Sequence, residues 1–157
     1  MSTDDHDSLV RRQFGASAER YRTSASHARG PSLDRLLALT AAAANGAVLD
    51  VATGAGHVAA ALAPRSGLVV AADLTREMLD QTAVLCRERS VDNVHLVLES
   101  AQALAHPDGA FDLVTCRVAA HHFPSPECFV SESARVLKPG GILALVDNVV
   151  PDSPAVA

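Results

Sequence analysis

The sequence contains few aromatic residues: among its 157 residues none is Trp, one is Tyr and four are Phe. A hydrophobic core formed by this chain must therefore consist mainly of Ala, Val and Leu. Because 48% of the residues are hydrophobic and 20% are charged, the composition is typical of a folded globular protein. The length corresponds to one domain.

Cysteines and long apolar runs are also scarce. The three cysteines, Cys86, Cys116 and Cys128, are widely spaced and form no Cys-x-x-Cys pair, so we expect reduced and buried thiols. No apolar run approaches the ~20 residues that a membrane-spanning helix needs. Residues 1–8 are too polar and acidic for a secretory signal. These features predict a soluble, cytoplasmic protein.

Basic residues are not in excess, since 13 Lys and Arg stand against 18 Asp and Glu, with a formal net charge of −5. A general nucleic-acid surface needs clustered basic residues, so we expect no nucleic-acid partner. We also expect no metal site. The adjacent His121 and His122 are unsuited to converge on one ion, and no third ligand stands at a useful spacing.

Short apolar segments alternate along the chain with segments of helical periodicity, which predicts an α/β fold with a parallel sheet. The predicted strands are 48–51, 68–73, 94–98, 111–116 and 142–146. The predicted helices are 33–44, 57–62, 75–89 and 125–137, with one or two shorter ones within 9–27. We expect a disordered tail at 1–8, N-terminal helices at 9–44, a core at 45–150 and a tail at 151–157.

One stretch organises the predicted core. A buried strand ends at Asp50, the chain turns through Gly54 and Gly56, and an alanine-rich helix continues to Leu62. Glycine adopts backbone angles that other residues avoid and lets a ligand approach the main chain closely. The amides at the start of the helix then face a ligand above the strand ends. This arrangement predicts a nucleotide-type binding turn.

The charge of Asp50 distinguishes two classes of nucleotide. The spacing Gly54-x-Gly56-x-x-Ala59 also satisfies the dinucleotide fingerprint, in which a pyrophosphate rests on the helix N-terminus. A carboxylate at the mouth of the turn repels a pyrophosphate but suits an ammonium or sulfonium group. We therefore favour a cationic ligand over NAD.

Asp73 ends the second predicted strand. A carboxylate there can accept hydrogen bonds from both hydroxyls of a ribose, which supports a nucleoside without identifying it. Two structural alternatives stay open: Asp73 as a cap for the following helix, and Asp50 as an acid that only stabilises the turn.

Several motifs occur in the order found in one enzyme family. They are Asp50-x-x-x-Gly54-x-Gly56, Asp73-Leu74-x-x-x-Met78-Leu79, Pro107-Asp108-Gly109-x-Phe111-Asp112, the segment 111–117, Ala120-His121-His122-Phe123 and the segment 135–141. Together they resemble the UbiE-type, class I S-adenosylmethionine-dependent methyltransferases (methyltransferase type 11 group) over about residues 45–150. The resemblance implies a Rossmann-like sheet of strand order 3-2-1-4-5 with helices on both faces, lacking the sixth and seventh strands of the family.

The resemblance implies S-adenosyl-L-methionine as the cofactor and assigns residues to its methionine end. Asp50 would lie near the ammonium group, and Arg117 beside it. Tyr21 and Phe14 would form an amino-terminal lid. The backbone around the methionine part would be that of Ala52, Thr53, Gly54, Ala55 and Gly56.

At the adenosine end, Asp73 would hold the ribose, Leu74 and Met78 would pack on the adenine, and Ser100 and Ala101 would lie at its edge. Two residues depart from the family pattern. Ser100 replaces a common Asp or Asn, and Ala55 replaces a common Thr. Each lost hydrogen bond is expected to cost ~1 kcal/mol of cofactor affinity.

Methyl transfer from a sulfonium needs in-line positioning of a nucleophile and removal of its proton. His121 or His122 could act as the base, since histidine titrates near neutral pH. The alternative is that both are loop or packing residues. Lys138–Gly141 is interpreted as a structural turn before the last strand.

The sequence therefore predicts a methyltransferase that acts on a small organic acceptor, for which a quinol or phenol is one candidate. A non-catalytic S-adenosylmethionine-binding fragment is the first alternative, and an NAD-linked oxidoreductase is the second. The apolar segment 142–150 is expected at a sheet edge, where it can pair with a second copy of the chain to form a homodimer.

Overall fold

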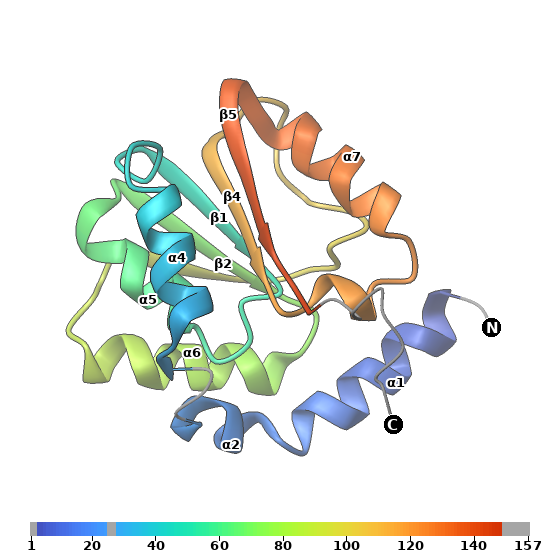
Figure 1. Ribbon diagram of the computed structural model, residues 1–157. Coiled ribbons are helices and arrows are strands. Elements are labelled where there is room, and N and C mark those ends of the chain that lie inside the picture. Colours follow the sequence, from blue (N-terminus) through green and yellow to red (C-terminus); the bar gives the residue numbers. More distant parts are fainter. Residues whose placement is uncertain (1–2, 25–27, 149–157) are drawn as a thin grey trace, which may run out of the picture.

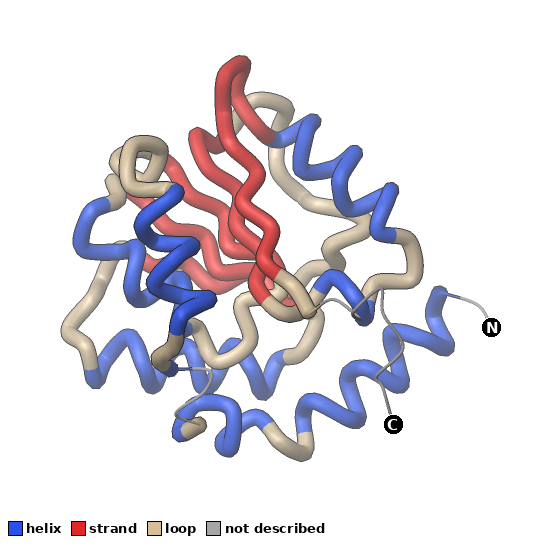
Figure 2. Tube along the Cα trace, in the orientation of Figure 1, coloured by secondary structure: helices blue, strands red, loops and turns tan. Residues whose placement is uncertain are grey.

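A five-stranded parallel sheet forms the centre of the molecule in the computed structural model, which describes residues 3–24 and 28–148 (Figures 1 and 2). The strands are β1 (Ala47–Val51), β2 (Leu68–Asp73), β3 (Val94–Leu98), β4 (Phe111–Arg117) and β5 (Leu137–Val146). Their order across the sheet is β3-β2-β1-β4-β5, and every pair is parallel. The predicted fold class and strand order are confirmed.

Helices cover both faces of this sheet (Figure 1). They are α1 (Thr3–Gly15), α2 (Ala18–Thr23), α4 (Pro31–Leu39), α5 (His57–Leu62), α6 (Arg76–Glu88) and α7 (Pro126–Val136), with 3-10 turns at Ala63–Arg65 and Ala120–His122. Helices α4, α5 and α6 pack on one face and α7 packs on the other. Helices α1 and α2 contact α6 and pass near the carboxyl ends of the strands (Figure 1).

The core has two layers because successive strand residues point to opposite faces of the sheet. Val48 and Leu113 belong to the layer that α4 and α5 complete, whereas Leu49 and Val114 belong to the layer that includes Phe129 of α7. The central strand β1 is buried from Val48 to Val51, as its unbroken apolar run predicts. A rigid sheet thus holds the strand ends in fixed positions.

The start of α7 follows the predicted capping pattern. Ser125 Oγ accepts a hydrogen bond of 3.1 Å from the amide of Cys128, and Pro126 occupies the first turn. At α6 the expected cap differs: within the described residues the Thr75 side chain makes no capping hydrogen bond, and Asp73 Oδ1 accepts from the Thr75 amide at 2.9 Å instead.

Three local predictions differ from the structure. Residues 3–8 lie in helix α1 rather than in a disordered tail. Helix α4 ends at Leu39 instead of continuing to residue 44; the hydroxyl and amide of Thr40 both donate to Leu36 O, and the chain then turns towards β1. Strand β5 begins at Leu137 instead of residue 142, so the expected turn at 138–141 is part of it, with a register shift opposite Phe111 and Leu113. Residues 1–2 and the predicted tail at 151–157 lie outside the described residues.

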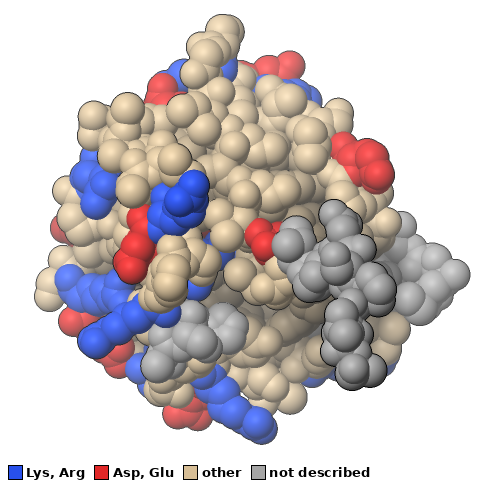
Figure 3. Space-filling model, in the orientation of Figure 1, with Lys and Arg blue, Asp and Glu red and all other residues tan. Residues whose placement is uncertain are grey.

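Strand β5 lies at one edge of the sheet, with the side chains of Ile142 and Leu145 partly exposed. Lys, Arg, Asp and Glu are interspersed over the face shown in Figure 3. The three cysteines are free; Cys86 and Cys116 are buried, while Cys128 is only half-buried. In the described part of the chain, no helix has the length and apolar character to cross a membrane.

Candidate functional site

A cavity of about 330 Å³ opens beyond the carboxyl ends of the strands. Its size falls in the range of small-molecule sites, and its place is where ligands bind in open parallel sheets. The structure brings nearly all the predicted site residues to its wall. These are Phe14, Tyr21, Asp50, Ala52, Thr53, Gly54, Ala55, Asp73, Leu74, Met78, Ser100, Ala101, Arg117, His121 and His122.

The turn after β1 is folded for close approach of a ligand to the backbone. Ala52 and Gly54 have positive φ angles of 52° and 57°. The Thr53 amide donates to Ala72 O at 2.9 Å, which ties the turn to the end of β2. A Cβ atom built on Gly54 has nothing within 4 Å, so this glycine leaves open space beside the cavity that a side chain would enter.

Gly56 is the exception among the predicted contacts, because it is buried behind the wall. Its φ is +84°, and a Cβ atom there would lie 2.5 Å from Thr82 Cγ2 on α6. The same Thr82 donates through Oγ1 to Gly54 O at 2.8 Å. Gly56 is thus not among the lining residues, and its lack of a side chain lets the turn pack on α6.

Asp50 is a buried carboxylate whose side chain is held by two neutral hydroxyls. Thr53 Oγ1 donates to Oδ2 at 2.6 Å, and Thr115 Oγ1 donates to Oδ1 at 2.7 Å. Burial raises the pKa of Asp50 to about 6, although both hydrogen bonds act to lower it. Such a group is stabilised by a cationic ligand that restores a partner of opposite charge.

Asp73 stabilises the turn through hydrogen bonds and can also accept hydrogen bonds from a ligand. Its Oδ2 accepts from the Gly54 amide at 2.8 Å, and its Oδ1 accepts from the Thr75 amide at 2.9 Å. Burial raises its pKa, and these hydrogen bonds oppose that shift. Because each carboxylate oxygen has a second lone pair, Asp73 can hold the turn, order the entry into α6 and still accept from ribose hydroxyls.

Arg117 is the last residue of β4 and lies on the wall with its guanidinium directed to α4. Its Nε and Nη2 donate to Ser32 Oγ at 3.0 Å and 2.9 Å. Burial lowers the pKa of Arg117, and the negative charge of Asp50 opposes this effect. Arg117 thus supplies a positive charge beside the acidic end of the cavity.

Apolar side chains from two further segments also line the cavity. Leu74 and the buried Met78 come from the segment after β2, and Ala101 comes from the segment after β3. Ser100 Oγ accepts from the Gln102 amide at 3.2 Å, so the short side chain also stabilises its own loop. The apolar side chains among these residues are of a kind that can pack against a planar base.

The amino-terminal helices close one side of the site. The ring of Phe14 packs edge-on against Tyr21 at 5.9 Å and against His122 at 5.1 Å. His57 Nε2 lies 3.0 Å from Tyr21 O and links α5 to α2. Phe14 of α1 and Tyr21 of α2 therefore both lie on the cavity wall.

The structure distinguishes the two adjacent histidines. His121 Nδ1 lies 2.6 Å from Asp147 Oδ1, and the His121 amide donates to Asp147 Oδ2 at 2.9 Å. Burial raises the pKa of Asp147, but hydrogen bonds from the Asn148 amide and from His121 keep it below its usual value. An ionised Asp147 accepts only, so Nδ1 carries the proton and Nε2 is left as the basic atom.

Sequence reasoning missed several wall residues. They are Val51, His57, Val58, Ala72, Thr75, Glu99, Gln102, Val118, Ala119, Phe123, Pro124 and Asn148. Val118 has a φ of +54°, which is unfavourable for a β-branched residue and occurs at the end of β4 inside the site. No sequence signal indicates such a conformation. Among the described residues, no group of three or more potential metal ligands converges.

The comparisons with known proteins agree with this geometry. The family model of the methyltransferase domain matches residues 49–145, which is more than half of the chain. The chain belongs to the methyltransferase domain family. S-adenosyl-L-methionine is the cofactor of this family, as the motifs predict.

Three relatives illustrate the similarity of this methyltransferase domain. The uncharacterised methyltransferase YcgJ of Bacillus subtilis is 38% identical over 141 residues, which is 90% of this chain and 56% of YcgJ. A ubiquinone biosynthesis O-methyltransferase of Xanthomonas campestris is 34% identical over 76% of the chain and 50% of its own length. A crystal structure from Bacillus halodurans, provisionally assigned as a methyltransferase, has 47% identity and a TM-score of 0.75, over 79% of this chain and 54% of that one. The chain spans about half the length of the curated relatives it matches.

Two features of the methyltransferase domain itself fit the cofactor. The open space beside Gly54 admits a ligand against the backbone, and the buried Asp50 offers a negative charge to a ligand that carries ammonium and sulfonium groups. The cavity residues therefore have the chemistry that the family assignment requires.

Proposed function

We propose that this domain binds S-adenosyl-L-methionine and takes part in methyl transfer to the hydroxyl group of a small aromatic acceptor, of quinol or phenol type. The observation that carries the proposal is that His121, whose Nδ1 lies 2.6 Å from Asp147 Oδ1, lines the same cavity as Asp50 and Asp73. A base for the acceptor and anionic contacts for the cofactor thus share one site.

The cofactor contacts are proposed from position and charge. Asp50 would face the ammonium group, Asp73 would accept from the ribose hydroxyls, and Leu74 and Met78 would cover the adenine. Ala101 and Ser100 would close the adenine end. When bound, S-adenosyl-L-methionine supplies a methyl group already activated by the sulfonium charge.

Aromatic side chains support a planar acceptor. Three of the five aromatic residues, Phe14, Tyr21 and Phe123, line the cavity, whereas Phe111 and Phe129 are buried in the core. Flat rings pack well against aromatic edges and faces. The relative named as a ubiquinone biosynthesis O-methyltransferase makes a ring hydroxyl a reasonable acceptor class for this chain as well.

His121 provides the proton transfer in this proposal. Its Nε2 would receive the proton of the acceptor hydroxyl as the oxygen bonds to the methyl carbon and the methyl–sulfur bond breaks, with S-adenosylhomocysteine as the leaving group. Asp147 would stabilise the resulting imidazolium. His122 packs beside His121, with ring centroids 3.9 Å apart, and against Phe14, so we assign it to the shape of the acceptor site.

Transfer of labelled methyl to a panel of quinols and phenols tests the proposal, after calorimetry with S-adenosylhomocysteine and with NAD. We expect heat with S-adenosylhomocysteine alone. His121→Gln should lower kcat by about 10²-fold or more, because proton transfer to a base contributes that much. His122→Gln is the matched control and should change kcat far less. Binding of NAD alone, or full activity of His121→Gln with a quinol, would contradict the proposal.

A further inference from the structure

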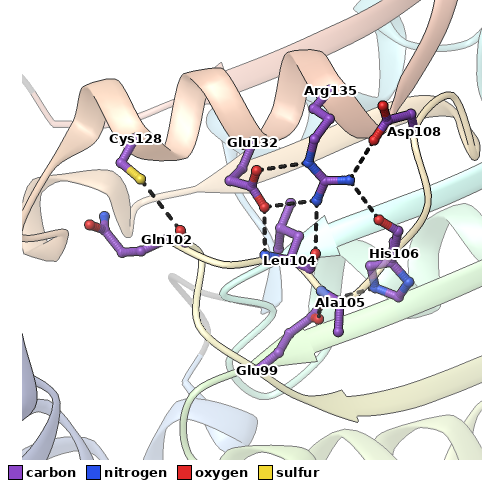
Figure 4. Close-up of polar contacts among 9 residues, drawn as sticks. All are labelled: Glu99, Gln102, Leu104, Ala105, His106, Asp108, Cys128, Glu132 and Arg135. Carbon is purple, nitrogen blue, oxygen red and sulfur yellow. Dashed lines mark hydrogen bonds and ion pairs between the residues drawn. The ribbon is translucent and has the colours of Figure 1, made fainter.

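The segment 99–110 joins β3 to β4 and supplies the wall residues Glu99, Ser100, Ala101 and Gln102. It contains no helix, so the helical crossover seen elsewhere in the sheet does not support it. Polar contacts with α7 take that place. Figure 4 shows Glu132 and Arg135 pointing from α7 towards this segment.

Arg135 uses all the donors of its guanidinium. Nε and Nη2 donate to the two oxygens of Glu132, each at 2.8 Å. Nη2 also donates to Leu104 O at 2.8 Å, and Nη1 donates to His106 O at 2.7 Å and to Asp108 Oδ1 at 2.9 Å. These five contacts match the five N–H groups of arginine, so a lysine with three donors cannot replace them.

Glu132 completes the link from helix to segment. Besides its paired contact with Arg135, its Oε2 accepts from the Leu104 amide at 2.9 Å. The hydrogen bonds from Arg135 lower the pKa of Glu132 to about 2, so the carboxylate stays ionised at neutral pH. Leu104 therefore has both its amide and its carbonyl bound to the pair, and its side chain is buried in the core.

The residues that Glu132 and Arg135 bind, Leu104 to Asp108, follow closely in the chain on the wall residues 99–102. Glu99 accepts from the Ala105 amide at 2.8 Å and contacts His106 Nε2 at 2.9 Å, which closes the segment on itself (Figure 4). Gln102 O accepts from Cys128 Sγ of α7 at 3.4 Å. Displacement of residues 104–106 would therefore move the wall at residues 99–102.

We propose that Glu132 and Arg135 are positioning residues for cofactor binding: together they hold the segment 99–108 in the shape that forms the adenine end of the cavity. Neither side chain lines the cavity. The inference rests on the proposed function, since it needs the nucleoside to occupy that end. If the inference is right, loss of either side chain weakens the binding of adenosine-containing ligands.

Calorimetry with two ligands tests the inference on the full chain: S-adenosylhomocysteine, and 5′-methylthioadenosine, which lacks the amino-acid part. Arg135→Lys and Glu132→Gln should each weaken both ligands by about tenfold, the effect of one good hydrogen bond. Asp50→Asn should weaken S-adenosylhomocysteine and leave 5′-methylthioadenosine unchanged. All measurements are made below the unfolding temperature of each variant, checked by circular dichroism.

Two controls separate positioning from a general loss of stability. Lys138→Met removes the ion pair to Asp112, 2.8 Å long, near Arg135 in the chain but outside the segment. Leu36→Val opens a small space in the core layer on the other face of the sheet. Both should bind the two ligands as the wild type does.

Hydrogen exchange provides a readout without any ligand. The amides of Leu104 and Ala105 should exchange faster in Arg135→Lys and Glu132→Gln, and at wild-type rates in the controls. Unchanged affinity in these two variants, equal weakening in a control, or weakening of S-adenosylhomocysteine alone would overturn the inference. If the wild type binds neither nucleoside, the proposed function fails. In that case the exchange rates of the Leu104 and Ala105 amides still test whether Glu132 and Arg135 hold the segment. Unchanged rates in the two variants would overturn this part of the inference.

Discussion

Thr115 Oγ1 donates a hydrogen bond of 2.7 Å to Asp50 Oδ1 across neighbouring strands β4 and β1. The two residues are paired in the strand register, and both are buried. A charge is thus placed inside the end of the sheet, where its side-chain hydrogen bonds come from neutral hydroxyls and Arg117 supplies a positive charge nearby. Burial still raises the pKa of Asp50, so the ionised carboxylate destabilises the ligand-free domain and favours a cationic ligand.

Asp50→Asn is therefore expected to stabilise the ligand-free domain at neutral pH. Burial raises the pKa of Asp50 from 3.8 to about 6, so the folded domain favours the protonated carboxyl. The stability that protonation contributes is fully present below pH 3.8 and is lost as the pH rises through 6. The resulting penalty at pH 7 is about 3 kcal/mol. Thermal unfolding followed by circular dichroism should show a higher Tm for the variant at pH 7.5 than for the wild type, with the difference shrinking towards pH 4.5.

The same variant should lose affinity for S-adenosylhomocysteine while it gains stability. Asp92→Asn, an exposed acid in the loop before β3, is the control and should change neither Tm nor affinity. A lower Tm for Asp50→Asn at pH 7.5 would show that the carboxylate stabilises the turn itself, which is the structural alternative considered for this residue.

The two glycines of the turn should respond differently to alanine. Gly54→Ala places a methyl group in open space with a φ of +57°, so we expect a stability loss of about 1 kcal/mol but severe loss of S-adenosylhomocysteine binding. Gly56→Ala places its methyl 2.5 Å from Thr82 Cγ2, with a φ of +84°, and should cost about 3 kcal/mol or more.

Urea unfolding and calorimetry measure the two effects of each glycine variant separately. Adding Thr82→Ser to Gly56→Ala should recover part of the lost stability, because it removes the methyl group that clashes. Equal stability losses for the two glycine variants would contradict this division between a ligand-facing and a helix-facing glycine.

The sequence was sufficient for features that depend on neighbouring residues. The apolar run ending at Asp50, the turn through Gly54 and the cap at Ser125 each lie within a few positions, and the structure forms them as predicted. The strand order came from the family resemblance. The homodimer through the edge of β5 stays a prediction, which sedimentation velocity can test.

Long-range relationships were not predictable in the same way. His121 and Asp147 are 26 residues apart, and they meet because β4 and β5 pair in a register that brings their ends together. Gly56 fits the cofactor motif, but its partner Thr82 is on another helix, so only the packed structure shows its role. The contacts of Arg135 with backbone carbonyls carry no sequence pattern at all.

Ser133 offers a test of the packing of α7. It is completely buried, and among the described residues its Oγ has no hydrogen-bond partner. Ser133→Ala should raise the free energy of unfolding by about 1 kcal/mol or more, because it removes a desolvated hydroxyl and improves helix propensity. Ser131→Ala, exposed on the same helix, carries only the propensity effect and should give about half that gain. Urea unfolding measures both; a loss of stability in Ser133→Ala would show that the hydroxyl is needed.

Asp147→Asn separates the orientation of His121 from binding of the cofactor. The carboxylate keeps Nδ1 protonated and Nε2 basic, whereas an amide can hold either tautomer, so kcat should fall by about 10²-fold. Affinity for S-adenosylhomocysteine should not change, since the pair lies on the acceptor side of our proposed site. Nitrogen chemical shifts of the His121 ring should report mixed tautomers in the variant and the Nδ1–H form in the wild type. Asp92→Asn, which alters an exposed carboxylate in the loop before β3, should leave kcat and the ring shifts unchanged. If Asp147→Asn keeps its kcat while the tautomer changes, His121 is not the base.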